Sequence, residues 1–438
     1  MSLFAGTLLF APLRGRAQGG ESAPLSAADY NDEQRLGDLL WNRSLEVRQA
    51  RGQVALAASE VTRAQLYPNP DLEFTWGTIP IGQTNPPDLK NPLAHVPNYG
   101  VVLSELLELF KRDPRRQASE AELSAARYES QAVYADRFFD LLHSLGEMAK
   151  SKLKASLLDG QIDVYDALLS LERQRLGKGD IAAVDVDREE VERARLAAAR
   201  DSAQAELETA RAECAALLAT DCPPFATGDD AGEFLRVPAE AEFPAAWSND
   251  IEARRPDIAA LGAAGDAADQ RITLAKRKAI PDVTVKVGYL YDTFLTAGNQ
   301  NQSVSFGLEM PLPVADRGQA DLQQADALRD RARSARQLLI SGGALSLGTS
   351  RQQLALARDR IARLRDAEHK ASELEKSVTG AARQGGASQV DVLLARRAYQ
   401  DLLVESADVR GDAFDASLKI RRAAALFPPP PGDANIGS

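Results

Sequence analysis

Few residues in this sequence have the types and spacing that catalysis requires. Ser151 and Lys154 match a Ser-x-x-Lys pair, in which a lysine can activate a serine nucleophile. The pair lies inside a long helical pattern and has neither a nucleophile elbow nor a supporting base. Gly177-Lys178-Gly179 has no strand before it and does not fit a phosphate-binding loop. We therefore expect no catalytic residues and no enzyme activity.

The histidines and cysteines do not form a metal-binding pattern. His95, His143 and His369 are scattered along the chain, and the three methionines offer no relay of ligands. Cys214 and Cys222 lack partner ligands, but their separation across the end of a helix permits a local disulfide in an oxidising compartment. We expect no metal site and no cofactor.

Composition narrows the class of protein further. The 438 residues carry a formal net charge of −11, which argues against binding to nucleic acid, because a phosphate backbone needs a basic footprint. Aromatic residues make up only 6%, and alanine, leucine and charged residues dominate, as is typical of long, closely packed helices. No apolar run is long enough for a membrane-spanning helix.

The strongest local pattern lies between Pro281 and Pro313. Apolar and polar residues alternate from Val283 to Asp292 and again from Ser303 to Met310, which predicts two strands with one apolar and one polar face. Such a hairpin is not stable alone in water. It fits a closed barrel in lipid, where neighbouring strands satisfy every backbone group. The alternative is an edge hairpin packed on a soluble core.

The same pattern occurs earlier in the chain. Ala64 to Asp71 leads into a strand as Ala275 to Asp282 does, and a Pro-rich loop from Pro80 to Pro97 leads to a second strand. The repeat aligns the apolar residues of the two halves. On this alignment, the positions predicted to share the apolar face are Leu72, Phe74, Trp76, Tyr99, Val101, Leu103, Val283, Val285, Val287, Tyr289, Val304, Phe306 and Leu308.

Each strand pair is followed by a long helical hairpin. The apolar spacing predicts one helix from Pro114 to Leu176 and one from Arg317 to Arg383, and glycines end both. Matched Val-Asp-Val triplets, centred on Asp185 and Asp391, then open return helices from Val184 to Leu218 and from Val390 to Leu426. Helices of this length are also typical of a coiled-coil rod, so the second hypothesis is a periplasmic or secreted structural scaffold with no pore.

These patterns divide the chain into two tandem repeats, at residues 30–220 and 247–426. Residues 1–18 resemble a secretory signal peptide that lacks the usual basic start. Residues 221–246 are rich in proline and glycine and are expected to be a linker with little regular structure. Residues 427–438 are expected to form an extended, disordered Pro-rich tail.

The order helix, strand, strand, long helix, glycine turn and return helix, given twice, resembles the TolC family of outer-membrane efflux channels. Arg255-Pro256-Asp257-Ile258 and Pro311-Leu312-Pro313 are similar to family signatures. Leu106 to Arg112 is similar to the corner found in the cation-efflux branch of cobalt, zinc and cadmium systems. The chain departs from that branch at Leu109-Phe110, where two glycines are common.

The resemblance implies a mainly α-helical fold with β-strands, assembled as a homotrimer. Four strands per chain would contribute to a twelve-stranded β-barrel in the outer-membrane lipid, continued by a long α-helical barrel in the periplasm. Such a protein is a passive exit duct that works with a periplasmic adaptor protein and an inner-membrane efflux pump. The thirteen apolar strand positions would then face lipid, and the similarity to the cation-efflux branch implies heavy-metal cations as the cargo.

The resemblance also implies roles for residues at the two helical turns. Asp185 and Asp391 align with aspartates near the family's constricted aperture, where three copies would favour cations. The alternative for each is helix capping or a solvated face. The family's tip arginine and tyrosine fall here on Ala387 and Ala382, so any closing contact must differ. The expected adaptor-docking residues are Gly177, Gly179, Asp180, Gly385, Gly386 and Ser388.

Overall fold

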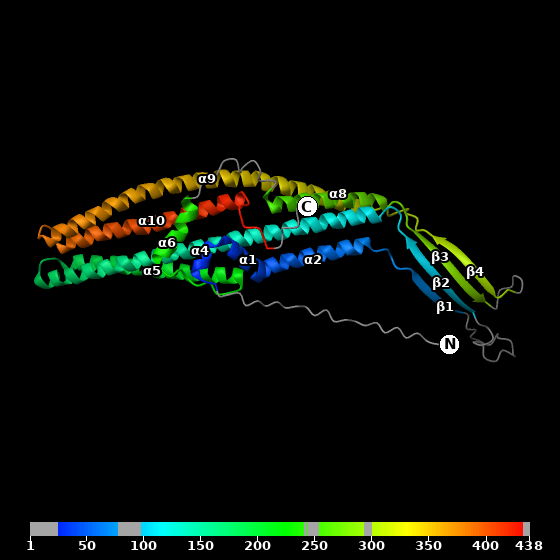
Figure 1. The fold of residues 1–438 in the computed structure, drawn as a ribbon, viewed down its shortest axis with the longest axis horizontal. Coiled ribbons are helices and arrows are strands. Elements are labelled where there is room, and N and C mark those ends of the chain that lie inside the picture. Colours follow the sequence, from blue (N-terminus) through cyan, green and yellow to red (C-terminus); the bar gives the residue numbers. More distant parts are fainter. Residues whose placement is uncertain (1–24, 78–97, 241–242, 244–253, 293–299, 432–438) are drawn as a thin grey trace, which may run out of the picture.

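A computed structural model describes residues 25–77, 98–240, 243, 254–292 and 300–431. The molecule is elongated, with a sheet at one end and two helical hairpins running to the other (Figure 1). The expected signal peptide at residues 1–18 and most of both strand-connecting loops lie outside the described residues. Among the described helices, none combines the length and the apolar character needed to cross a membrane.

The four predicted strands form one antiparallel sheet. They are β1 (Asp71–Trp76), β2 (Asn98–Leu107), β3 (Val283–Asp292) and β4 (Gln302–Glu309), in the order β1-β2-β3-β4. The pairs β1-β2 and β3-β4 are the predicted hairpins, and the pair β2-β3 joins the two repeats. The sheet is therefore a single structure built equally from both halves of the chain.

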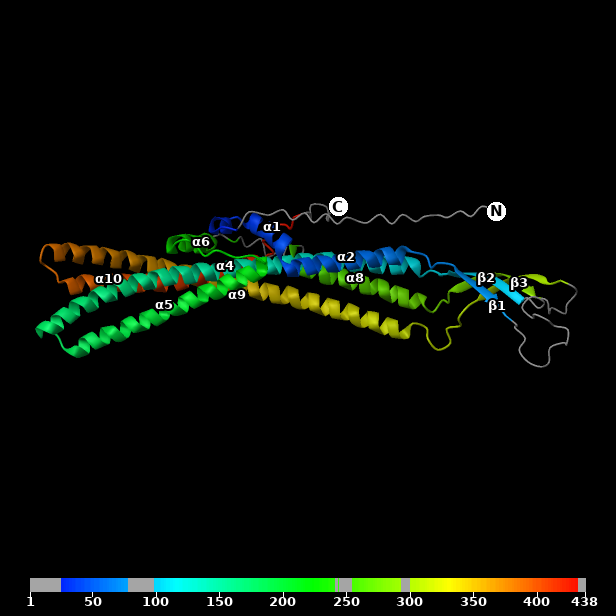
Figure 2. The ribbon, with the colours of Figure 1, turned by 90° about the horizontal axis from the view of Figure 1, so that it is seen from below.

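The two long helical hairpins confirm the predicted periodicity. The first consists of α4 (Arg112–Lys178) and α5 (Ala183–Leu218), and the second of α9 (Gln319–Arg383) and α10 (Gln389–Ala423). At about 1.5 Å per residue, α4 and α9 are each roughly 100 Å long. Figure 2 shows both turns at the same end of the molecule, opposite the sheet.

Two shorter helices lead into the strands. α2 (Leu45–Gln65) packs on α4 and precedes β1, and α8 (Pro256–Arg277) packs on α4 and α9 and precedes β3. Each repeat therefore contains a helix, two strands and a helical hairpin in the predicted order. The short helices extend the bundle from its middle to the sheet (Figure 1).

The main hydrophobic core lies midway along the molecule. Tyr134, Phe138 and Leu145 of α4 are fully buried there, together with Phe414 of α10 and Leu36 of α1 (Glu33–Arg43). A 3-10 helix, η1 (Ala27–Asn31), leads into α1. Cys214 and Cys222 are buried in this cluster and form the disulfide that their spacing permits.

The prediction that residues 221–246 have little regular structure is wrong in part. Helix α6 (Gly228–Glu240) occupies this segment and packs on α4 and α10. Thr227 caps it, because its Oγ1 accepts a hydrogen bond from the N–H of Asp230 at 3.1 Å and the Asp230 carboxylate accepts one from the N–H of Thr227 at 3.1 Å. Phe234 and Leu235 are buried in the core.

The prediction that the disordered tail begins at residue 427 is also wrong at its start. Phe427 packs against the core, with its ring centroid 6.1 Å from that of Tyr134 and 6.3 Å from that of Phe139. Burial of the large aromatic ring stabilises this position, although the residues that follow it are prolines. Residues 432–438 lie outside the described residues.

Candidate functional site at the sheet and the helical turns

One face of the sheet is apolar and exposed. Directly opposed residues share a face, and the register places Leu72, Leu103, Val287 and Phe306 in one row across all four strands. The next row is Phe74, Val101, Tyr289 and Val304. Exposures reach 80% for Phe306, 77% for Leu308 and 71% for Leu72. The remaining predicted positions, Trp76, Tyr99, Val283, Val285 and Leu308, follow the same alternation.

The other face of the sheet has a different chemistry. Lys286 forms an ion pair with Glu309 across β3 and β4, and Oγ1 of Thr75 donates a hydrogen bond to the carbonyl of Gly100 at 3.4 Å. Gly288 is buried, and a Cβ there would lie 2.6 Å from Oγ of Ser305. A small residue at this position lets polar side chains of the neighbouring strand lie close to the sheet.

Charged contacts fix the sheet to the helices. Nζ of Lys111 lies 2.8 Å from the Asp282 carboxylate, which also accepts a hydrogen bond from the N–H of Leu109 at 3.1 Å. Nη2 of Arg115 donates to Oε2 of Glu108 at 2.8 Å. The Lys111–Asp282 pair joins the segment after β2 to the residue before β3. Residues of both repeats therefore hold the sheet against the helices.

The turn between α9 and α10 is a capped glycine turn. Gly385 has φ 79°, in the left-handed region that glycine adopts at low cost. Oγ of Ser388 accepts a hydrogen bond from the N–H of Asp391 at 3.1 Å, and the Asp391 carboxylate accepts one from the N–H of Ser388 at 2.9 Å. These hydrogen bonds hold the pKa of Asp391 below its usual range, the Ser388 side chain first. Asp391 therefore has the capping role that the sequence left as an alternative.

The turn between α4 and α5 also contains a glycine with positive φ, but the helix that follows it has no side-chain cap. Gly179 has φ 80°, and the N–H of Asp180 donates to the carbonyl of Arg175 at 2.9 Å. Ala182 occupies the N-cap of α5 and offers no side-chain cap. Asp185 is therefore not held in a capping box as Asp391 is. Gly177 and Gly179 are exposed, as are Gly385 and Gly386 at the other turn.

Near the turn between α4 and α5, the structure shows an acidic residue, besides Asp180 and Asp185, that the sequence did not predict as part of a site. Glu172 of α4 has one carboxylate oxygen that is buried with no hydrogen-bond partner among the described residues. Burial raises the pKa of this carboxyl, and the neighbouring Glu189 and Asp185 raise it further, against an opposing effect of Arg175. Glu172 lies within a helical run of charged residues, where spacing alone does not reveal burial.

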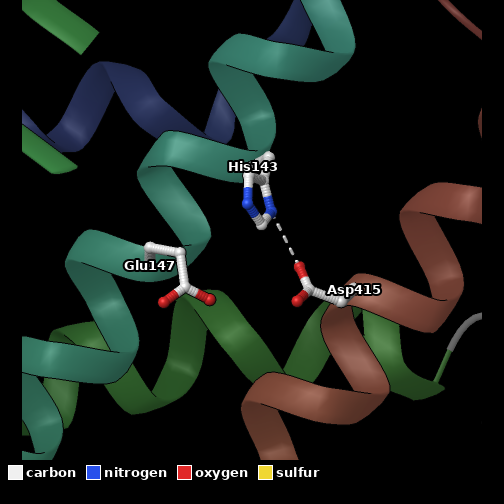
Figure 3. A group of neighbouring side chains, drawn as sticks. All are labelled: His143, Glu147 and Asp415. Carbon is white, nitrogen blue, oxygen red and sulfur yellow. Dashed lines mark hydrogen bonds and ion pairs between the residues drawn. The ribbon is translucent and has the colours of Figure 1, made fainter. Parts of the chain in front are cut away.

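The structure brings one histidine together with two carboxylates midway along the bundle. Nδ1 of His143 lies 3.0 Å from Oδ1 of Asp415, and Glu147 lies one helical turn from His143 (Figure 3). The hydrogen bond to Asp415 raises the pKa of His143, against an opposing effect of burial. His369 is not part of this group, and His95 lies outside the described residues. The sequence did not predict this group because Asp415 is far from His143 along the chain.

Comparison with known proteins gives two sequence relationships. Residues 247–426 match the sequence profile of the family described as outer membrane efflux protein. The cobalt-zinc-cadmium resistance protein CzcC of Cupriavidus metallidurans is 26% identical to this chain over 303 residues, which cover 67% of this chain and 68% of that protein.

Solved structures show the same fold. A crystal structure of CusC, a protein that forms a transmembrane channel, has a TM-score of 0.70 at 15% identity and covers 90% of this chain and 92% of its own. The Campylobacter jejuni CmeC outer membrane channel has a TM-score of 0.69 at 12% identity and covers 97% and 94%. The mainly helical fold with a small sheet is therefore that of outer-membrane channel proteins.

Proposed function

We propose that three copies of this chain form the exit duct of a tripartite efflux system, because residues 247–426 match the outer membrane efflux protein family. The duct lies in the outer membrane, with its helical part in the periplasm. It conducts substrate passively from an inner-membrane pump and a periplasmic adaptor to the exterior. Residues 30–220 and 247–426 are the two repeats that each contribute two strands and one helical hairpin.

The two-faced sheet carries this proposal. Thirteen apolar residues from four strands lie on one face and ten of them are exposed, while the Lys286–Glu309 pair and Thr75 lie on the other face. A surface of this kind is unfavourable in water and favourable against lipid acyl chains. The outer edges of β1 and β4 have unpaired backbone groups, which lipid does not tolerate. Pairing β4 of one copy with β1 of the next closes twelve strands into a barrel.

The CzcC relationship supports a proposal for the substrate class. That protein is named for resistance to cobalt, zinc and cadmium, and we propose divalent metal cations as the cargo here. The acidic residues at the turns suit this cargo, because three copies of Asp185 around one axis favour cations over anions. The glycine turns, with Asp180 and Ser388, form the proposed adaptor-docking surface.

Cell fractionation and reconstitution test the duct. We expect the protein in the outer-membrane fraction, extracted only by detergent, with the mass of three chains and with ion conductance in planar bilayers. A coiled-coil scaffold would instead appear in the soluble fraction without conductance. That result would overturn the proposed function.

The aspartates are tested in the same bilayers. Replacing Asp185 with Asn should lower the preference for cations, because it removes one charge per chain from the aperture. Asp391→Asn should also lower this preference, and it should weaken the start of α10 as well, because the carboxylate of Asp391 accepts hydrogen bonds from Ser388. Unchanged selectivity and conductance in the double variant would remove both residues from the aperture.

A further inference from the structure

We propose that His143, Glu147 and Asp415 form a binding site for a divalent transition-metal cation such as Zn²⁺ or Co²⁺, built between α4 and α10. The site lies midway along the bundle and away from both helical turns. It goes beyond the proposed duct, because a duct needs no resident metal site.

Two helices supply the three ligands. His143 and Glu147 are four residues apart on α4 and so lie on one face of the helix, and Asp415 faces them from α10 (Figure 3). One ligand atom from each residue lies within 4.8 Å of those of the other two, and Nδ1 of His143 lies 3.0 Å from Oδ1 of Asp415. Small rotations of partly exposed side chains bring them to one ion.

The ligand set suits a borderline metal. One imidazole nitrogen and two carboxylate oxygens are ligands of Zn²⁺, at about 2.0–2.2 Å, and a water molecule completes four-coordination. Imidazole favours zinc and its transition-metal neighbours over Mg²⁺ and Ca²⁺, which prefer oxygen alone. The chemistry therefore points to zinc-like cations rather than to the hard cations.

Lys150 competes with the metal for Glu147. Its ammonium nitrogen lies 2.8 Å from Oε1 and 2.7 Å from Oε2 of that carboxylate. A bound metal ion must displace this ammonium group from at least one oxygen. Removing the charge of Lys150 while keeping its length should therefore strengthen metal binding.

The chain contains its own control. His369, Glu373 and Lys376 repeat the same spacing on α9, and Lys376 Nζ lies 2.9 Å from Oε1 of Glu373. In the part of the chain that the structure describes, the only grouping of three such ligands is the one that includes Asp415. If the carboxylate from the facing helix creates the site, His369 should not bind metal comparably.

The test measures Zn²⁺ and Co²⁺ binding to the metal-free, detergent-solubilised full chain by titration calorimetry and by the visible absorption of tetrahedral Co²⁺. We expect one site per chain. His143→Ala and Asp415→Asn should each weaken it more than about ten-fold, Lys150→Met should strengthen it, and His369→Ala should leave it unchanged. Helical circular dichroism and oligomer mass verify that each variant is folded.

Three results would overturn the proposal. These are no binding by the unaltered chain, equal losses for His143→Ala and His369→Ala, or no tetrahedral Co²⁺ spectrum. None of them bears on conductance, so the metal site and the duct fail separately.

Discussion

Near the turn between α4 and α5, the carboxyl group of Glu172 lies close to those of Glu189 and Asp185. Its pKa is raised by burial first, then by Glu189 and Asp185. A carboxyl with a raised pKa in the folded state stabilises the fold fully below its ordinary value of 4.5, and this contribution is lost as pH rises through the raised value. At neutral pH the folded protein therefore holds an unfavourable charge at this position.

Glu172→Gln should raise the thermal midpoint of the detergent-solubilised protein at neutral pH, because the amide carries no charge. The gain should disappear below about pH 4, where the carboxyl of the unaltered chain is protonated in both states. Thermal unfolding followed by circular dichroism at the two pH values measures the difference.

Glu190 is the matched control for this prediction. It lies in the same turn region but accepts a hydrogen bond from Nη2 of Arg173 at 2.6 Å, so neutralising it removes an ion pair. Glu190→Gln should give no gain at neutral pH. Equal midpoints for Glu172→Gln and the unaltered protein at neutral pH would show that the buried oxygen carries no penalty.

At the scale of the element, the two return helices differ at the N-cap residue that precedes each of them. Ser388 caps α10 through the reciprocal hydrogen bonds with Asp391, whereas Ala182, the N-cap residue of α5, offers no side-chain cap. Asp185 already occupies the position in α5 that Asp391 occupies in α10. One substitution is therefore enough to create the second capping box.

Ala182→Ser should stabilise the start of α5 by about 1 kcal/mol, and Ser388→Ala should destabilise the start of α10 by a similar amount. Hydrogen exchange of the first-turn amides measures both effects, as slower exchange in the first variant and faster exchange in the second. A Ser388→Ala variant with unchanged exchange in α10 would show that the cap contributes nothing to the turn.

The contact between α4 and α10 depends on a glycine. Gly146 is buried, and a Cβ there would lie 2.3 Å from Cε1 of Phe414, which is itself fully buried. Gly146→Ala should destabilise the protein by about 1–3 kcal/mol, because neither helix can move without disturbing the core. Denaturant unfolding in detergent measures the change.

Gly262→Ala is the control on α8, where a Cβ meets nothing within 4 Å. It should be neutral or stabilise the helix by up to about 1 kcal/mol, as alanine favours helix over glycine. If both variants lost stability equally, the close approach of α4 and α10 would not be the reason.

Sequence reasoning succeeded where a pattern is local. Alternation predicted the four strands, apolar spacing predicted the long helices α4 and α9, and the glycine turns with their Val-Asp-Val triplets predicted the return helices α5 and α10, each within a few residues. Helix α6 was not predicted, because prolines and glycines are frequent in residues 221–246. Its local signals are the capping box of Thr227 and Asp230 and the buried Phe234 and Leu235 that follow.

Long-range features could not be predicted in this way. The pairing of β2 with β3 and the approach of Asp415 to His143 depend on how the two repeats pack, and no spacing along the chain encodes either. Partial burial of Glu172 is likewise a property of the assembled hairpin. The sequence therefore predicted the elements and their faces but not the sites formed between repeats.

At the scale of the whole molecule, the proposed barrel requires the sheet to separate lipid on one face from water on the other. Phe306 and Ser305 are neighbours on β4 but lie on opposite faces, in register with Val287 and Gly288 of β3. Phe306 belongs to the proposed lipid-facing surface, and Ser305 to the face proposed to line the passage. The same substitution at these two positions therefore tests which face of the sheet contacts lipid and which contacts water.

Phe306→Arg should impair membrane insertion, because a charge facing the middle of the bilayer costs about 2–4 kcal/mol. Ser305→Arg should insert normally and lower the conductance of cations, since its charge would enter the aqueous passage. Insertion is measured as the fraction that folds into lipid vesicles and resists protease, and conductance in planar bilayers. Equal insertion of the two variants would mean that the apolar face does not contact lipid, and the barrel would have to be abandoned even if the helical bundle assembled.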